Sequence, residues 1–84
     1  MYKVRILRRA LKDLSSFPQG YARLIAEHIE RLQDNPRPPG VKKLRGVESY
    51  SLRVGVYRIL YDVDDATRSI LIYRIKHRRE VYRR

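Results

Sequence analysis

The residues best suited to chemistry lie at the end of the chain, in residues 74–84. These eleven residues include six Lys or Arg, one His, one Tyr and a single acid, Glu80. Clustered cations bind phosphate oxygens, and a neighbouring phenol ring can stack on a nucleobase. The segment therefore indicates a surface that binds a phosphate chain and a base.

The charge of the whole chain points to a polyanionic partner. The 84 residues carry 20 Lys and Arg against 9 Asp and Glu, which gives a net charge of +11. Such a charge attracts nucleic acid, acidic protein segments or anionic membrane surfaces. A membrane partner is disfavoured because no basic amphipathic helix stands out in the sequence. The other two partners are compatible, since an acidic protein segment can block a nucleic-acid site.

The composition also limits the class of protein. A chain of 84 residues that is 43% hydrophobic is expected to form one small domain, residues 1–84. Without Cys it forms no disulfide and no thiolate zinc site, and two isolated His leave little room for a metal. No apolar run approaches membrane-spanning length, and the N-terminus lacks the apolar region of a signal peptide. We therefore expect a cytoplasmic protein.

The elements that must position the C-terminal cations begin with a strand and two helices. Residues 2–7 alternate between apolar and basic side chains, as in a half-buried strand. Apolar residues at helical spacing predict a helix over residues 8–16, and a second helix is predicted to begin at Pro18 and to end before Pro36. The apolar stripe of the second helix consists of Ala22, Ile25, Ala26, Ile29 and Leu32.

Three further strands are predicted at residues 50–54, 57–63 and 68–76. Gly55 marks a tight turn between the first two, and residues 64–67 have the composition of a second turn. The element order is therefore β-α-α-β-β-β. We predict an α+β fold in which a two-helix hairpin packs on one face of an antiparallel sheet.

Strand alternation gathers basic residues on the face away from the helices. If the apolar positions of the middle strand face the helices, Arg58 faces outward, and a tight turn can place Arg53 beside it. Packing Leu71, Tyr73 and Ile75 inward leaves Arg74 and Lys76 outward. A single charge on such a face is ordinarily just solvated. Like charges on neighbouring strands repel one another, so the group favours an anion-binding site.

Tyr82 lies outside the strand pattern, between Val81 and a terminal pair of arginines. One interpretation is a ring that stacks on a base, and the other is a ring that packs against the sheet. Both remain open. His77 lies inside the basic cluster, where an imidazole suits a proton acceptor.

Three segments together resemble the RelE/ParE superfamily of bacterial and archaeal toxin–antitoxin modules. They are Lys-Leu-Arg-Gly at 43–46, Tyr-Ser-Leu-Arg-Val-Gly-Val-Tyr-Arg-Ile-Leu-Tyr at 50–61, and His-Arg-Arg-Glu-Val-Tyr at 77–82. Each motif alone is weak, but their order and spacing match the superfamily along essentially the whole chain. The Tyr-Arg pair in the strand and the closing Glu-Val-Tyr resemble the RelE branch most.

The resemblance implies a RelE-like fold and a toxin that cleaves mRNA. RelE-type toxins are ribosome-dependent endonucleases that need no metal and no cofactor. They cut the codon in the A site, where the ribose 2′-OH attacks the adjacent phosphate. The implied partners are an acidic RelB-like antitoxin, the ribosome and mRNA, and operator DNA only through the antitoxin complex.

The resemblance also assigns roles to residues of this chain. Arg58 would stabilise the charge of the transition state, Arg78 would match the C-terminal arginine of the active site, and the alignment can slip by one to Arg79. Tyr82 would stack on the base and assist proton transfer. Arg53 and His77 complete the candidate catalytic set. The candidate RNA-binding residues are Lys43, Arg45, Arg74, Lys76 and Arg79.

The chain departs from the superfamily pattern at one position. Some members carry two lysines on the strand that here contains Ser51 and Arg53, and serine cannot replace lysine as a cationic acid or base. His77 is our candidate substitute, because it lies in the same cluster.

Two other functions compete with the nuclease. A ParE-like toxin that inhibits DNA gyrase without catalysis has the same fold but does not need Arg58, Arg78 and Tyr82. A basic nucleic-acid-binding module without chemistry explains the charge but not the spacing of all three motifs. We rank the nuclease first, then the gyrase inhibitor, then the binding module.

Overall fold

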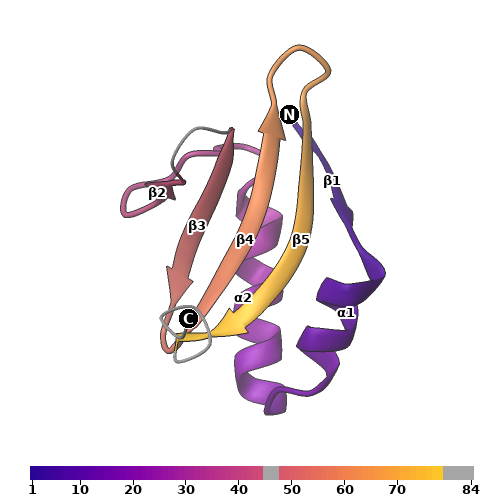
Figure 1. The fold of residues 1–84 in the computed structure, drawn as a ribbon, viewed down its shortest axis with the longest axis vertical. Coiled ribbons are helices and arrows are strands. Elements are labelled where there is room, and N and C mark those ends of the chain that lie inside the picture. The colour runs from indigo at the N-terminus through magenta and orange to yellow at the C-terminus, as the bar shows by residue number, and fades with distance from the viewer. Residues whose placement is uncertain (45–47, 79–84) are drawn as a thin grey trace.

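The computed structural model describes residues 1–44 and 48–78. Within these residues, two helices and five strands follow one another (Figure 1). In order they are β1 (Lys3–Ile6), α1 (Arg8–Ser15), α2 (Gln19–Arg31), β2 (Lys42–Lys43), β3 (Ser49–Val54), β4 (Tyr57–Asp64) and β5 (Ser69–His77).

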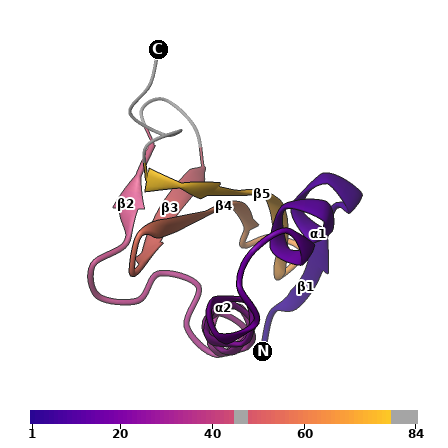
Figure 2. The same ribbon diagram turned by 90° about the horizontal axis from the view of Figure 1, so that it is seen from below.

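The strands form one mixed sheet in the order β1-β5-β4-β3-β2, and both helices lie on the same side of it (Figure 2). The predicted α+β architecture with a two-helix hairpin on one face is therefore confirmed. The prediction of a purely antiparallel sheet is wrong, because β1 pairs with β5 in parallel. A parallel pair needs a long crossover, and the chain between β1 and β5 provides it. The two-residue strand β2 was not predicted.

The helices follow the apolar spacing of the sequence. Ala10 is fully buried on α1, while Ile25 and Ile29 are buried on α2. Pro18 lies directly before α2, at a position where its missing N–H costs no helical hydrogen bond. Neither helix in the described part of the chain is long and apolar enough to cross a lipid bilayer.

The turns are formed by the residues that the sequence indicated. Gly55 has a φ of 62°, which a two-residue hairpin turn needs at its first position, and Val54 pairs with Tyr57 across it. At the other end of β4, Asp64 Oδ1 accepts hydrogen bonds from the backbone N–H groups of Ala66 (3.0 Å) and Thr67 (3.2 Å). This carboxylate thereby replaces a backbone acceptor in the turn.

The core lies between the sheet and the helices. Tyr61 is its largest fully buried side chain, and its hydroxyl donates a hydrogen bond of 2.7 Å to the carbonyl of Pro36. Burial raises the pKa of this phenol well above its usual value. This hydrogen bond fixes the loop after α2 to the side of the sheet that faces the helices.

The side chains of β5 that face the core differ from those we predicted. Ile70 and Ile72 are buried with Ile75, whereas Leu71 and Tyr73 are only half-buried. Tyr61 pairs with Ile72 and the preceding Leu60 pairs with Arg74, so one extra residue of β5 lies between them. Such a bulge shifts the alternation of a strand by one residue, and simple alternation in the sequence does not reveal it.

Candidate functional site

Three cations form a continuous row across the face of the sheet that points away from the helices. Arg53 on β3 lies opposite Arg58 on β4, and Arg58 lies opposite Lys76 on β5. Opposite residues on neighbouring strands have Cβ atoms only about 5 Å apart, so their charges repel one another. We call Arg53, Arg58 and Lys76 the basic row. The structure thus brings these three residues together, as strand alternation predicted.

A pocket of about 110 Å³ lies at one end of the basic row, beside the turn between β3 and β4. Arg53, Arg58 and Arg78 line it together with Gly55 and Tyr57. Three guanidinium groups can surround one phosphate with planar pairs of N–H donors. The geometry therefore suits a phosphate that gains negative charge during a reaction.

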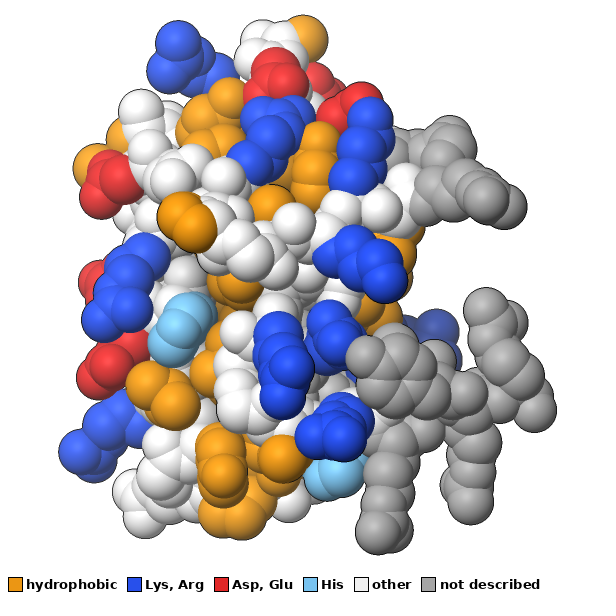
Figure 3. All heavy atoms as spheres, turned by 90° about the vertical axis from the view of Figure 1, so that its left-hand side faces the viewer, with side chains coloured by type: hydrophobic (Ala, Val, Ile, Leu, Met, Phe, Trp, Pro, Cys, Tyr) orange, Lys and Arg blue, Asp and Glu red, His pale blue; other side chains and the backbone are white. Residues whose placement is uncertain are grey.

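Two hydrogen bonds hold the arginines of this pocket in place. The backbone N–H of Arg78 donates to the carbonyl of Val56 at 2.6 Å, which fixes the end of β5 against the turn. Arg53 Nε donates to the carbonyl of Gly55 at 3.2 Å. Viewed from the side of β2 and β3, Lys and Arg side chains occur over the whole surface, and several of them lie close together in its lower half (Figure 3).

Arg74, which we predicted to bind RNA, has its guanidinium paired with an acid on α1. Its Nε and Nη2 donate to the two carboxylate oxygens of Asp13 on α1, at 2.8 and 3.0 Å. The backbone N–H of Ile75 donates to the same carboxylate at 2.9 Å. Since β1 pairs with β5 only as far as Ile72, the edge of β5 beyond that point is open to α1. Arg74 lies opposite Leu60, on the same face as Lys76, as predicted, but its guanidinium is held by Asp13 and anchors α1.

This anchor shifts the titration of its acid. Burial alone would raise the pKa of Asp13, but hydrogen bonds from Arg74 and the backbone of Ile75 outweigh burial and hold this pKa below its usual value. Only 17% of the Asp13 side chain and 27% of the Arg74 side chain are exposed. The pair is thus shielded enough to matter for folding.

His77 lies on the opposite face of the sheet from the basic row. It pairs with Tyr57, which is buried on the helix side, and the two rings meet edge to face with centroids 5.5 Å apart. Its neighbour Lys76 points to the outer face. The geometry therefore does not place this imidazole beside Arg58, where a proton acceptor for the predicted reaction would lie.

Of the remaining predicted residues, one lies on the edge strand β2 and three lie outside the described residues. Lys43 Nζ forms an ion pair with Glu48 at 3.1 Å, and the hydrogen bond from Lys43 lowers the pKa of that carboxyl. Arg45, Arg79 and Tyr82 lie outside the described residues.

Sequence reasoning gave no role to Arg37, which joins three segments of the chain. Its Nη2 forms an ion pair with Asp65 at 2.9 Å, and its Nε donates to the hydroxyl of Tyr50 at 2.8 Å. Asp65 also accepts a hydrogen bond of 2.6 Å from the hydroxyl of Tyr2. An arginine between two prolines carries no pattern that would predict these partners.

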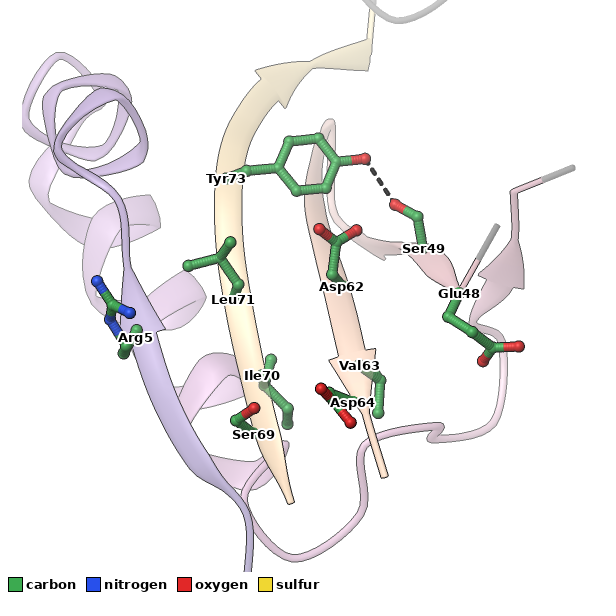
Figure 4. Close-up of a pocket in the computed structure, with 10 residues that line it drawn as sticks. All are labelled: Arg5, Glu48, Ser49, Asp62, Val63, Asp64, Ser69, Ile70, Leu71 and Tyr73. Atoms are coloured by element: carbon green, nitrogen blue, oxygen red, sulfur yellow. Dashed lines mark hydrogen bonds between the residues drawn. The ribbon is translucent and has the colours of Figure 1, made fainter. Parts of the chain in front are cut away.

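The other end of the outer face has the opposite charge (Figure 4). A hollow of about 710 Å³ is bordered there by the carboxylates of Glu48, Asp62 and Asp64, with Arg5 on the β1 side. The hydroxyl groups of Tyr73 and Ser49 form a hydrogen bond of 2.7 Å across it. We call this region the acidic hollow. Its carboxylates repel phosphates, so the two ends of one face differ in the ligands they accept.

Comparison with known sequences gives two related answers. A family model described as the ParE toxin of the type II toxin–antitoxin system parDE matches residues 4–82. A protein of Methanocaldococcus jannaschii named as toxin RelE1 is 36% identical over 98% of this chain and 96% of its own length. Toxin RelG of Mycobacterium tuberculosis is 32% identical over 99% of this chain and 98% of its own length.

Comparison with solved structures agrees. The archaeal RelE–RelB complex from Pyrococcus horikoshii contains a chain that matches with a TM-score of 0.84 and 32% identity. The match covers 92% of the present chain and 94% of that chain. The family model, the relatives and the fold all point to one group of proteins, and the chain belongs to the RelE/ParE family of toxins of type II toxin–antitoxin systems.

Proposed function

We propose that this toxin is a ribosome-dependent endoribonuclease that cleaves mRNA codons in the A site without a metal. The observation that supports the proposal most strongly is the pocket lined by Arg53, Arg58 and Arg78. The two relatives carry the names of RelE-type toxins, and the resemblance of the sequence to the RelE branch points the same way.

In the proposed reaction the 2′-OH of the ribose attacks the neighbouring phosphate, and the 5′-oxygen leaves. The phosphorane that forms carries extra negative charge, and Arg58 is half-buried at the centre of the basic row, where it can bind the equatorial oxygens. Arg53 and Arg78 bind the same phosphate from the two sides of the pocket. Lys76 contributes positive charge from β5.

The ribosome supplies the alignment in this proposal. A charged pocket stabilises the transition state, but it does not by itself place the 2′-OH in line with the leaving oxygen. Decoding in the A site holds the codon in a fixed conformation, which lowers the entropic part of the barrier. In the proposal Tyr82 stacks on a base of the codon and assists proton transfer, while Arg45 and Arg79 contact further phosphates.

The proposed partner that blocks the toxin is an acidic, RelB-like antitoxin. The P. horikoshii relative was solved as a RelE–RelB complex. An acidic segment laid along the basic row would neutralise the repulsion between its cations and exclude RNA. Operator DNA would then be bound through the complex, with the antitoxin making the contacts.

Induction in bacteria followed by primer extension on a translated mRNA tests the nuclease. The wild type is expected to produce new cuts inside translated codons, and Arg58→Ala is expected to produce none. Arg23→Ala is a matched control, because Arg23 is exposed on α2 and lies away from the row. Both variants should melt as the wild type does, within a few degrees.

Other outcomes would redirect the assignment. Growth arrest without cuts would favour inhibition of DNA gyrase, the reading that the name of the matching family model supports. No toxicity from a folded, expressed chain would leave a basic binding module.

A further inference from the structure

Tyr21, near the start of α2, is more exposed than the other tyrosines that the structure describes. Its surface is 39% exposed. The other tyrosines in residues 1–44 and 48–78 are buried or half-buried, namely Tyr2, Tyr50, Tyr57, Tyr61 and Tyr73. Four of them use their hydroxyl groups in hydrogen bonds of the fold. Exposure alone assigns no role to Tyr21, so its position has to indicate one.

The ring of Tyr21 lies against the turn beside the arginine pocket. A Cβ atom placed on Gly55 would lie 3.2 Å from Cε1 of this ring. Gly55 itself lines the pocket, together with Arg53, Arg58 and Arg78. Hydrophobic side chains also border the lower group of cations in Figure 3. The ring is therefore separated from the pocket by the width of a single glycine.

Aromatic contacts hold the ring of Tyr21 in place. It meets the ring of Tyr57 edge to face, with centroids 5.1 Å apart. Tyr57 is 7% exposed and packs in turn on Phe17, with centroids 4.2 Å apart. A ring that is already fixed by buried neighbours loses little side-chain entropy when a ligand stacks on it. The exposed part of Tyr21 is thus a preformed surface beside the pocket.

A nucleobase fits this surface better than an acidic peptide does. Within a nucleotide one sugar joins the base to its phosphate, so the base beside a phosphate in the pocket lies at the edge of the pocket. Every nucleobase has a planar face that stacks on an aromatic ring. The arginines would also attract carboxylates, but the face of a phenol ring carries negative potential and repels them.

We propose that Tyr21 is a base-stacking residue, whose ring binds the face of a nucleobase next to the phosphate held by Arg53, Arg58 and Arg78. The inference rests on the proposed function, because it adds a base position to the phosphate pocket of the endonuclease. It gives α2 a part in RNA binding, whereas the residues that we predicted to act on RNA lie after the helices.

A fluorescent reporter at this position tests the contact without relying on catalysis. The chain contains no tryptophan, so Tyr21→Trp introduces a single indole. The probe is an oligonucleotide with 2′-O-methyl groups on every ribose, prepared also as a series with one abasic site at a time. Binding at low salt should quench the indole, and one abasic site should restore its emission. Leu11→Trp, at an exposed position of α1, is the matched control and should not respond.

Affinities of two further variants separate stacking from a structural role. Tyr21→Leu removes the ring and should weaken binding of the intact RNA roughly tenfold. It should cause no further loss with the RNA that lacks the stacked base, because the two changes remove the same contact. Tyr21→Phe keeps the ring and should retain the wild-type affinity.

The outcomes distinguish this inference from the nuclease itself. Equal quenching in Tyr21→Trp and Leu11→Trp would overturn the contact, even if the wild type cuts mRNA, and so would a failure to bind the RNA. Equal losses of affinity with intact and abasic RNA in Tyr21→Leu would assign the ring a structural role instead. Quenching by an acidic peptide and not by RNA would assign the surface to a protein partner. The expected pattern in a toxin that produces no cuts would support the contact and reject the endonuclease.

Discussion

The two ends of the outer sheet face lie on the same strands, but one end carries mainly carboxylates and the other mainly cations. At the acidic hollow, carboxylates are used for structure: Asp64 closes a turn and Glu48 pairs with Lys43. At the basic row, Arg58 lies between Arg53 and Lys76, and the sheet register places no acid opposite any of them. The acidic end stabilises the fold, whereas the basic end stores repulsion that a polyanion can relieve.

The largest expected difference is between the cleavage rates of Arg78→Ala and Arg79→Ala, which change adjacent arginines. Arg78→Ala removes a guanidinium from the pocket and should lower the rate of cleavage on ribosomes about 100-fold. Arg79→Ala should lower it less than about tenfold, because a peripheral phosphate contact contributes less than a contact to the reacting phosphate. Single-turnover cleavage of a programmed ribosome measures both. The reverse order of effects would assign the pocket role to Arg79.

Removing the ion pair between Asp13 and Arg74, which holds α1 against β5, should lower the stability of the fold and leave cleavage unchanged. Asp13→Ala leaves Arg74 and the N–H of Ile75 without their acceptor, which should cost about 2 kcal/mol of unfolding free energy. Urea denaturation at pH 7 measures the loss. Cleavage per folded molecule should stay at the wild-type level, and a large loss of cleavage would show that Arg74 takes part in RNA binding after all.

The same anchor predicts a pH dependence. The pKa of Asp13 is lower in the folded chain than in the unfolded chain, so the ionised pair stabilises the fold above the usual pKa of an aspartate. That contribution is lost as the pH falls below about 4 and through the lowered pKa. Denaturation of wild type and Asp13→Asn should therefore differ at pH 7 and converge near pH 2. A constant difference across this range would contradict the ionic account.

Arg37→Ala tests whether the ion pairs beside the acidic hollow stabilise the fold, since Arg37 also pairs with Glu48. The substitution removes the ion pair to Asp65 and the hydrogen bond to Tyr50, which join the loop after α2 to the sheet. Because Arg37 is partly exposed, we expect only a modest fall in the melting temperature, about 5 °C. Arg9→Ala, which removes an exposed arginine of α1, is a suitable control. Equal melting of Arg37→Ala and wild type would mean that the network contributes nothing measurable.

The smallest expected effect concerns salt. Repulsion in the basic row should ease as salt rises from about 20 mM to about 200 mM, so the melting temperature should increase by a few degrees. Arg53→Ser should reduce that increase, since it removes one charge from the row. A melting temperature that does not respond to salt would argue against a concentrated cationic face.

Local patterns in the sequence predicted the elements well, and tertiary features accounted for the errors. The alternation at Arg53 and Arg58 was sufficient to place them side by side, because a two-residue turn at Gly55 fixes their register. The bulge beside Leu60 was not predictable, and it reversed the faces of Leu71 and Tyr73. The parallel pairing of β1 depends on contacts across most of the chain, which spacing cannot show.

The candidate site was predictable to a similar extent. Charge and spacing indicated the row, but they could not show that Asp13 holds Arg74. That ion pair depends on the open edge of β5. His77 shares the face of Ile75, two residues before it, so strand alternation already pointed its side chain away from the row.

The central claim is that catalysis belongs to the basic end of this face and not to the face as a whole. Arg58 and Asp62 lie four residues apart on β4 and share the same side, so they are separated by about 13 Å. The most direct test is single-turnover cleavage of ribosome-bound mRNA by Arg58→Ala and Asp62→Ala, measured side by side. We predict a loss of at least about 100-fold for Arg58→Ala and a change of less than about threefold for Asp62→Ala. Wild-type cleavage by Arg58→Ala, or equal losses in both variants, would contradict the account.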